Sequence, residues 1–540
     1  MGTSEAVSLS GDSPTRSHPA EAVQRVAARV VEGGVWALLL FTPLVLGAVS
    51  ERDTAIMEGG CFTLLIVAWW ARLRRQGSRL PRWVSWPAGF FCLWTLFQMV
   101  PLPTSVLRVL SPGTHAAYSR FLPGYASHGG GTDLQAWLLM RKGARSGGLS
   151  PREGQVTGLE GEILVRPAAR SISWYPWRTL RWLCRFLAYW ACFHVVVRHL
   201  PERALEKRLP WLVLVLGFGI ALLGIVQRYT WNGKILWFIP VYQGYPFGPW
   251  VNRNHFSGYL EMALPQACSV LTREAGLHSG HRRRRRSVRT TTPRLALIAF
   301  LLVPMVAALF MAGSRGGLFS LALTACLYAF LQGYRGLARR SSRWVRVVLP
   351  LVPLLCCVVA IGLYIHFAGG ASPQESRVEP SLGTRLRAWK GVLDMIAANP
   401  LTGTGLGTFS LAYPFYKTYG ETDIWAQAHN DYLQLFAETG LVGFSLFLGG
   451  LIFLLRRRVL PCLSEPWRRQ TPVALGACLG LVTLLLHALV DFNFQIPSNG
   501  LLFVLLGGLL VARGPSSGQP TGISGRHPGR ELSRSAEVLE

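Results

Sequence analysis

The chain has 540 residues, of which 50% are hydrophobic and only 15% are charged, and it contains 19 Trp and 26 Phe. Soluble proteins carry about 25% charged residues, so this composition excludes a large soluble enzyme and an intrinsically disordered chain. The net charge of +28 comes in short basic blocks between apolar runs, which is typical of membrane-protein loops and argues against nucleic-acid binding.

In chain order, residues 1–33 are predicted to form a polar cytoplasmic tail, and 34–513 a polytopic membrane domain. A helix needs about 20 apolar residues to cross a bilayer, where no water is present to satisfy the backbone. The sequence therefore predicts an all-α fold. Its twelve candidate transmembrane runs are 34–50, 56–71, 84–101, 177–197, 210–230, 255–271, 295–313, 316–333, 347–367, 434–455, 472–491 and 498–513.

Arginine and lysine gather after every second run. The basic stretches are 72–82, 198–208, 273–294, 335–346 and 456–469. Because basic loops stay in the cytoplasm, both termini are predicted to be cytoplasmic. The tail 514–540, rich in Ser, Gly and Arg, is predicted to be disordered. Residues 102–176 and 368–433 are then long extracytoplasmic loops, the second of them helical, and loops of that length are usually functional.

Polar residues collect at the outer ends of the runs, and Arg315 is the first candidate. It lies in the turn Gly313-Ser314-Arg315-Gly316 between two apolar runs. A helix that starts there offers free backbone N–H groups beside a guanidinium, which suits a phosphate. An arginine at that depth can also simply extend to lipid headgroups.

Arg385 is the second candidate cation, in the loop 368–433. It shares a helix face with Trp389, four residues further on. Two guanidinium groups stabilise a diphosphate leaving group without a metal ion. A solvated charge beside a packed tryptophan is the alternative, and Arg387 competes with Arg385 for the role.

His429 is the candidate general base, in the segment Ala-His-Asn-Asp just before an apolar run. A neutral imidazole accepts a hydroxyl proton near neutral pH. The alternative is a histidine that bonds at the membrane interface. A serine-hydrolase triad with Asp431 is rejected, because residues two apart do not share a helix face. A zinc site of His255, His429 and His487 is rejected for want of a ligand spacing.

Residues 403–407 form a GxGxG segment. No strand precedes it and the spacing is not GxGxxG, so a dinucleotide site is not expected. A tight turn, or backbone amides that touch a phosphate, are the two interpretations. Glu438 is expected to pair with a cation or a backbone group, and Asp491 to support the site.

In this order the motifs resemble those of the O-antigen ligase and polymerase family of bacterial membrane glycosyltransferases, over residues 210–500. The segments that carry the resemblance are Asn252-Arg-Asn254-His, Gly313-Ser314-Arg315-Gly316-Gly317, Arg385-xxx-Trp389, Asn399-Pro400 with Gly403, Gly405 and Gly407, His429-Asn430-(x9)-Gly440, and Asp491-Phe-Asn493 with Asn499. The family's usual Leu is a Trp at position 389, so Arg385 and Arg387 both stay candidates.

The resemblance implies transfer of a glycan from an undecaprenyl-diphosphate carrier to a hydroxyl of lipid A-core, of another glycan repeat or of a protein. It implies a metal-independent, inverting enzyme without a cofactor, at the periplasmic face of the inner membrane. Arg315 and Arg385 would bind the diphosphate and His429 would activate the acceptor. The expected substrate-binding residues are Asn252, Asn254, Ser314, Arg387, Trp389, Tyr416, Asn430 and Asp491.

Two other hypotheses remain. Twelve spans also suit a polysaccharide or lipid-glycan transporter or flippase, although such proteins place substrates near the midplane, often between inverted repeats. A non-catalytic scaffold that meets other polysaccharide-assembly proteins is the third. Ligase and polymerase activity are not separated by the sequence.

Overall fold

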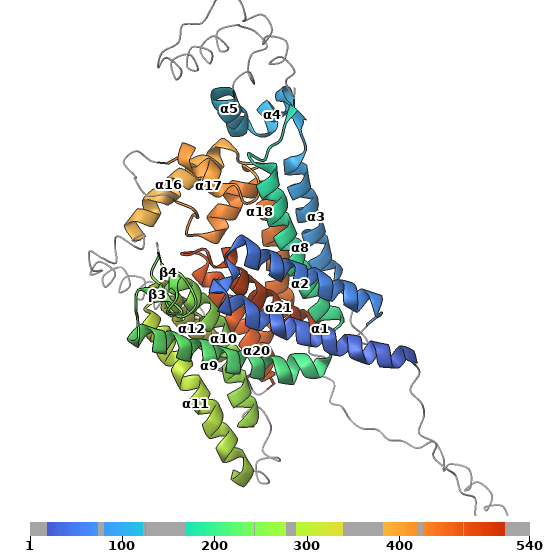
Figure 1. Cartoon of the computed structure of the whole chain (residues 1–540), viewed down its shortest axis with the longest axis vertical. Coiled ribbons are helices and arrows are strands. Elements are labelled where there is room, and N and C mark those ends of the chain that lie inside the picture. The colour runs from blue at the N-terminus through green and yellow to red at the C-terminus, as the bar shows by residue number, and fades with distance from the viewer. Residues whose placement is uncertain are drawn as a thin grey trace, which may run out of the picture.

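The computed structural model of the chain (Figure 1) describes residues 19–73, 80–122, 125, 169–241, 244–276, 288–338, 382–417, 425–467 and 469–513. Several predicted features fall outside these residues: the first part of the N-terminal tail, most of the loop 102–176, the apolar run 347–367, the start of the loop 368–433, and the tail 514–540.

Almost all described elements are helices. Their bounds are α1 Pro19–Leu44, α2 Glu51–Trp70, α3 Arg82–Met99, α4 Thr104–Leu110, α5 Pro112–Phe121, α8 Pro176–Arg198, α9 Leu209–Tyr229, α10 Arg253–Glu274, α11 Val288–Ala312, α12 Arg315–Ala338, α16 Leu382–Ala398, α17 Phe409–Ala412, α18 Asp431–Leu454, α19 Leu460–Ser464, α20 Pro472–His487 and α21 Pro497–Ala512. Short 3-10 or π turns are η1 Leu46–Ala48, η2 Ala204–Arg208, η4 Tyr413–Phe415, η5 Leu455–Val459 and η6 Asn493–Gln495.

Two small antiparallel ladders complete the described elements. β1 Leu102–Pro103 pairs with β2 Ala169–Arg170, and β3 Lys234–Ile235 pairs with β4 Ile239–Pro240. The first ladder holds together the two ends of the long segment between α3 and α8. The second forms a hairpin within the segment that connects α9 to α10.

The helices begin where the sequence supplies start signals. Proline occupies the first turn of α8, α20 and α21, where a missing N–H costs nothing. Ser50 caps α2 by accepting a hydrogen bond from the N–H of Asp53 at 3.1 Å. Local sequence therefore determines where these helices start.

The predicted apolar runs coincide with helices wherever the structure describes them, and the protein is an all-helical membrane protein. By length and composition, six of the described helices qualify as membrane spans, so the count of twelve stays a prediction. They are Glu21–Leu44, Pro176–Arg198, Ala204–Tyr229, Pro293–Ala312, Arg315–Tyr334 and Asp431–Ser464. Two shorter apolar helices are Pro472–His487 and Pro497–Ala512.

The predicted tail 1–33 overlaps the first half of α1, which begins at Pro19. Residues 34–50 are therefore only the apolar half of a longer helix. The sequence between Pro19 and Gly33 is amphipathic rather than apolar, so it carries no uninterrupted apolar run that would predict the start of this helix.

The core is built around α10, which packs against α9, α11 and α20. α10 is buried along most of its length although it carries Asn254, His255, Ser257 and Glu261. A buried helix with that many polar groups must find partners for them inside the protein. Most of those partners lie on α20 and on the turn that follows it.

A second hydrophobic cluster lies over one end of the bundle. Side chains of α16, α17 and the segment before α18 form it, among them Val392, Phe409, Tyr413 and Trp425. Figure 1 shows α16 and α17 beside α18, at the same end as α4 and α5. The described part of the loop 368–433 is therefore helical and packed, and it lies against the polar ends of the core helices.

Candidate functional site

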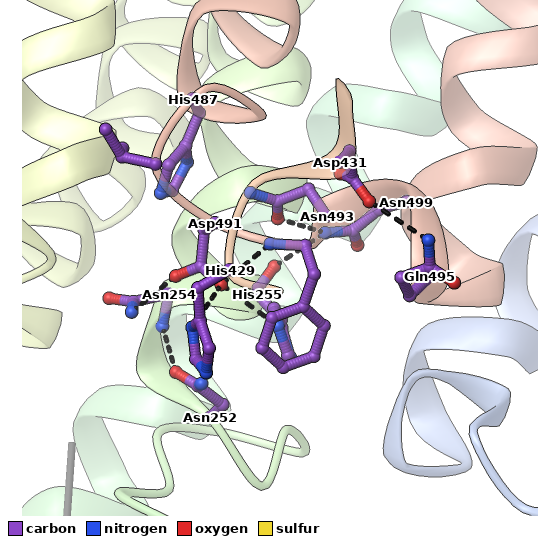
Figure 2. A network of polar contacts seen from close by, with 12 residues as sticks. Asn252, Asn254, His255, His429, Asp431, His487, Asp491, Asn493, Gln495 and Asn499 are labelled. Carbon is purple, nitrogen blue, oxygen red and sulfur yellow. Dashed lines mark hydrogen bonds and ion pairs between the residues drawn. The ribbon is translucent and has the colours of Figure 1, made fainter. Parts of the chain in front are cut away.

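Four segments far apart in the sequence meet at this end of the bundle. They are the start of α10, the start of α18, α16, and the turn between α20 and α21. Figure 2 shows polar side chains from the starts of α10 and α18 and from that turn arranged around Asp491, which lies in the turn. The site is thus formed at the ends of helices rather than at their middles.

Asp491 is fully buried and is the centre of the arrangement. Its Oδ2 accepts a hydrogen bond from Asn254 Nδ2 at 2.7 Å, and its Oδ1 accepts one from the N–H of Phe492 at 2.8 Å. Its carboxylate also faces three groups that carry or can carry positive charge. Arg385 Nη2 lies 3.9 Å from Oδ2, and His429 Nδ1 and His255 Nε2 lie 3.4 Å and 3.8 Å from Oδ1.

These neighbours set the charge of Asp491. Burial raises the pKa of its carboxyl, but the contacts with His429, Arg385 and His255 outweigh burial and hold that pKa well below its usual value. Asp491 is therefore an anion at neutral pH. A fixed anion at this point orients cationic and imidazole side chains around itself.

His429 is held in an unusual backbone conformation. Its φ is +49°, a left-handed value that a residue with a Cβ rarely adopts. Its ring stands edge-on to Trp425 and Phe492, with centroids 5.5 Å and 4.7 Å away. The next residue, Asn430, begins α18. Strain of this kind persists only where the surroundings enforce it, and it is common at functional sites.

Arg385 enters the site and Arg387 does not contact it. Arg385 is 8% exposed and Nη1 donates to the carbonyl of Val490, whereas Arg387 is exposed and its Nη2 donates to Thr384 at 3.3 Å. Among the residues that the structure describes, the Nε of Arg385 has no hydrogen-bond partner. A donor buried in this way is available to a bound anion.

Trp389 fixes α16 to the segment that carries His429. Its Nε1 donates to the carbonyl of Ala428 at 2.8 Å. Arg385 and Trp389 share one face of α16, so the tryptophan anchors the face from which Arg385 reaches Asp491. The contact explains why the two residues occur at this spacing.

Arg315 begins α12, directly after a turn in which Gly313 has a φ of +65°. That turn lies close to α10, because a Cβ built on Gly313 would be 3.8 Å from Nη1 of Arg253. A Cβ on Gly316 would be 2.9 Å from Nε2 of His487. Glycine is needed where α12 meets α20, and this contact brings the first turn of α12 to the end of α20, four residues before Asp491.

A second buried pair lies against the first turn of α12. His487 Nδ1 and Glu261 Oε1 are 2.9 Å apart, and both side chains are almost completely buried. A Cβ on Gly317 would meet Glu261 Oε2 at 3.0 Å. The pair therefore braces the first turn of α12 against α10 and α20, and it is not a direct part of the Asp491 group.

The GxGxG segment resolves into the tight turn, and its amides are already occupied. Gly407 N–H donates to Glu438 Oε2 at 2.7 Å, and Phe409 N–H donates to Oε1 at 3.0 Å. The N–H of Gly405 donates to the carbonyl of Glu438 at 2.8 Å. The carboxylate of Glu438 occupies the position that a phosphate would need. Of the two partners predicted for Glu438, a cation or a backbone group, the structure shows backbone groups.

Several predicted substrate-binding residues hold the backbone in place. Asn252 accepts a hydrogen bond from the N–H of Asn254 at 2.8 Å, and Asn430 accepts two at 3.0 Å from the first turn of α18. Ser314 Oγ accepts from the N–H of Gly317 at 3.3 Å. Tyr416 packs in the cluster over α18, and its OH accepts from Asn399 at 3.5 Å.

Three side chains near the site, those of Arg253, His255 and His487, are not among the predicted catalytic or substrate-binding residues. The guanidinium of Arg253 lies over the ring of Tyr245 at 4.3 Å and close to the Gly313 turn. His255 and His487 were considered only as zinc ligands. Two features of the sequence indicate that these side chains lie near the site. Arg253 and His255 belong to the motif Asn-Arg-Asn-His, and His487 lies four residues before Asp491.

Asp431 has a separate role. Its carboxylate accepts from the N–H of Phe494 at 2.9 Å and from Gln495 Nε2 at 3.2 Å. It thus ties the start of α18 to the turn after α20 and does not contact His429 as a triad member would. In the described ranges, no group of three or more His, Cys, Asp or Glu is arranged to hold a metal ion.

Comparison with models of protein families gives a match over part of the chain. The family model of the O-antigen ligases matches residues 300–448, a region that includes Arg315, Arg385 and His429. Asp491 and His255 lie outside the matched region. A search of curated proteins finds no match.

Proposed function

The chain belongs to the O-antigen ligase and polymerase family by its region 300–448, and on that premise we propose the reaction and the roles of the residues. The protein transfers a glycan from an undecaprenyl-diphosphate carrier to a hydroxyl group. Arg315 and Arg385 bind the diphosphate, His429 takes the proton of the acceptor, and Asp491 positions both His429 and Arg385. The observation that carries the proposal is the convergence of these groups at one end of the bundle.

The diphosphate role of the arginines rests on charge and on available donors. Arg385 is buried beside Asp491 with a free Nε donor among the described residues. Arg315 stands at the N-terminus of α12, a helix of 24 residues whose first N–H groups and dipole favour an anion. Charge-assisted contacts of this kind strengthen as the leaving diphosphate gains negative charge, so they lower the barrier.

The role of His429 rests on its orientation. Nδ1 faces the carboxylate of Asp491, which favours the tautomer with the proton on Nδ1. Nε2, on the other side of the ring, is then the basic nitrogen. Because Asp491 stays anionic, it also stabilises the imidazolium that forms when His429 accepts a proton.

The reaction balances with these groups alone. The acceptor oxygen attacks the anomeric carbon of the donor sugar and loses its proton to Nε2 of His429. The bond between that carbon and the diphosphate oxygen breaks, and undecaprenyl diphosphate leaves with the bonding electrons. Attack from the face opposite the diphosphate inverts the anomeric configuration, and no metal ion is required.

The proposed membrane arrangement has twelve spans with both termini in the cytoplasm of a bacterial inner membrane. The orientation is supported by a difference in charge between the two ends of the bundle. Arg273 and Arg513 both contact Glu206 at the end opposite the site, and Arg456–Arg458 lie on the turn that leaves α18. By the positive-inside rule that end is cytoplasmic, so the site faces the periplasm.

The test is glycan transfer by the purified protein from an undecaprenyl-diphosphate-linked donor. Arg315→Ala, Arg385→Ala and His429→Ala should each reduce transfer by at least about 10²-fold. Arg387→Ala is the matched control and should stay close to wild type, because its side chain is exposed. Chelation by EDTA should not reduce the rate. Wild-type transfer by all three variants would refute the assignment.

A deletion strain separates the two forms of the activity. Gel analysis of its surface polysaccharide should show either lipid-linked polymer that never reaches its acceptor, which indicates a ligase, or single repeats without long chains, which indicates a polymerase. Unchanged polysaccharide would contradict both.

A further inference from the structure

A groove lies between α2 and α8, at the end of the bundle opposite the candidate site. The two helices run in the same direction and are joined at both ends. Arg181 Nη1 lies 2.6 Å from Glu51 Oε1 near their starts, and His199 Nδ1 lies 2.5 Å from the carbonyl of Leu73 near their ends. Positions along one helix therefore correspond to positions along the other.

The groove is a hollow of about 1180 Å³. Its lining comes from the last turns of α2 and α8 and from the residues just after them. Trp69 and Trp70 are 77% and 69% exposed, so large aromatic faces are open to the surroundings. Tryptophan in such numbers at one end of a membrane helix is typical of the bilayer interface.

The lining changes in character along the helix axes. Leu65, Ile66 and Trp190 line the part nearer the middle of the bundle, and Arg72 and Arg198 line the part at its end. Because the helices are parallel and in register, the apolar residues of one helix face those of the other across the groove, and so do the two arginines. The hollow is apolar at one end and cationic at the other, which is the polarity of a phospholipid with an anionic headgroup.

The groove is already formed in the protein alone. The contact of His199 with Leu73 fixes the cationic end, and the rings of His194 and His199 pack with centroids 5.4 Å apart. Trp190 stacks on Phe193 at 5.5 Å and 20° between planes. A ligand that enters it would not have to order these side chains, which favours binding.

We propose that this groove binds an anionic phospholipid of the adjoining membrane leaflet. Its acyl chains lie along Leu65, Ile66 and Trp190, and its phosphate lies between Arg72 and Arg198. Basic pockets between membrane helices bind such headgroups. The sequence continues after Leu73 with further arginines, Arg74 and Arg75, so the charge of this stretch is strongly positive.

The experiment is a lipid titration of the purified full-length protein, followed by native mass spectrometry. Dioleoyl phosphatidylglycerol is compared with dioleoyl phosphatidylcholine, which has the same chains and no net charge. One arginine near a headgroup is worth about fivefold in binding, so phosphatidylglycerol should bind about thirty-fold more tightly. Equal binding of the two lipids by the wild-type protein overturns the proposal without any variant.

The double variant Arg72→Gln/Arg198→Gln should lose most of that preference. Arg457→Gln is the matched control, since Arg457 is exposed at the same end of the bundle and does not line the groove. A preference that persists in the double variant, or that falls equally in the control, also overturns the proposal. Millimolar inorganic phosphate should not displace the lipid; displacement would mean that the arginines bind free phosphate instead.

Discussion

At the scale of single residues, the site depends on one buried carboxylate. Asp491 neutralises Arg385 and orients His429, and both contacts come from segments that are more than 60 residues away in the chain. A buried charge that loses its partner is costly, by about 3–5 kcal/mol. Asp491 should therefore matter for stability as well as for transfer.

Asp491→Asn tests both effects. We expect transfer to fall by at least about 10²-fold, because an amide neither stabilises the imidazolium of His429 nor fixes its tautomer. Stability at pH 7 should fall by about 3 kcal/mol, since the buried Arg385 loses its anion. A variant with wild-type transfer and stability would remove Asp491 from the site.

The pH dependence of that stability loss follows from the low pKa of Asp491. A carboxyl whose pKa is depressed by folding stabilises the protein above its unfolded pKa of about 3.9, and this contribution is lost as the pH falls through the folded value. The difference in thermal stability between wild type and Asp491→Asn should thus not shrink from pH 7 to about pH 5 and should shrink only below about pH 4. A difference that vanishes by pH 6 would contradict the assignment.

The residues of the site were predictable in unequal measure. Arg315 and His429 carry ionisable groups at the ends of apolar runs, and such groups in a membrane protein are usually functional. Arg385 was predictable from its spacing to Trp389 in the loop 368–433. Asn430 and Ser314 were assigned to substrate, but their side chains cap helices, a role that the same residue types favour. The hydrogen bond from Asn254 to Asp491 joins segments 237 residues apart, and no local pattern encodes it.

At the scale of elements, a kink in α18 supports the site. Gly440 has φ of +64° and ψ of −176°, and a Cβ there would lie 2.3 Å from the backbone of Leu401. Gly403 has φ of +65° and would meet the backbone of Glu438 at 2.4 Å. The GxGxG turn and the kink therefore fit together backbone to backbone, with the carboxylate of Glu438 bound in the turn.

Gly440→Ala should destabilise the protein, because its φ and ψ are accessible essentially to glycine alone and the added methyl meets the backbone of Leu401. We expect a loss of at least about 3 kcal/mol, measured as a lower melting temperature of the purified protein. Gly449→Ala is the control in the same helix, since a Cβ there has nothing within 4 Å. That change should leave the melting temperature unchanged or slightly raise it. Equal effects of the two substitutions would rule out the proposed fit.

Element positions were predictable because apolar runs of membrane length leave few alternatives to a helix. The runs near 177–197 and 316–333, for example, correspond to α8 and α12. The partner of the GxGxG segment was not predictable, since Glu438 lies 31 residues after Gly407 in the chain. A carboxylate and a phosphate bind the same set of backbone amides, and only the fold shows which one is present.

At the scale of the whole molecule, the two ends of the bundle differ in chemistry. The proposed site occupies one end, and the other carries Arg273 and Arg513 around Glu206 together with the groove between α2 and α8. The separation follows from helix direction, because the polar motifs lie at the N-terminal ends of α10, α12 and α18 and at the C-terminal end of α20. The charge pattern of the loops made this division predictable, whereas the count of twelve spans stays a prediction.

Cysteine labelling tests the orientation. Lys234→Cys lies in the β3–β4 hairpin near the site, and Arg457→Cys lies at the basic end; both positions are exposed. A membrane-impermeant maleimide added to intact spheroplasts should label the first and not the second, with wild-type protein as the background. Detergent should then make both reactive. The reverse pattern would place the proposed site in the cytoplasm.

The most direct measurement is binding of undecaprenyl diphosphate to the purified protein, alongside glycan transfer. Arg315→Gln and Arg385→Gln should each weaken binding by about tenfold or more, because each removes charge-assisted contacts to the diphosphate. His429→Gln should bind undecaprenyl diphosphate like wild type and yet fail to transfer glycan. Wild-type binding by both arginine variants, or wild-type transfer by His429→Gln, would contradict the account.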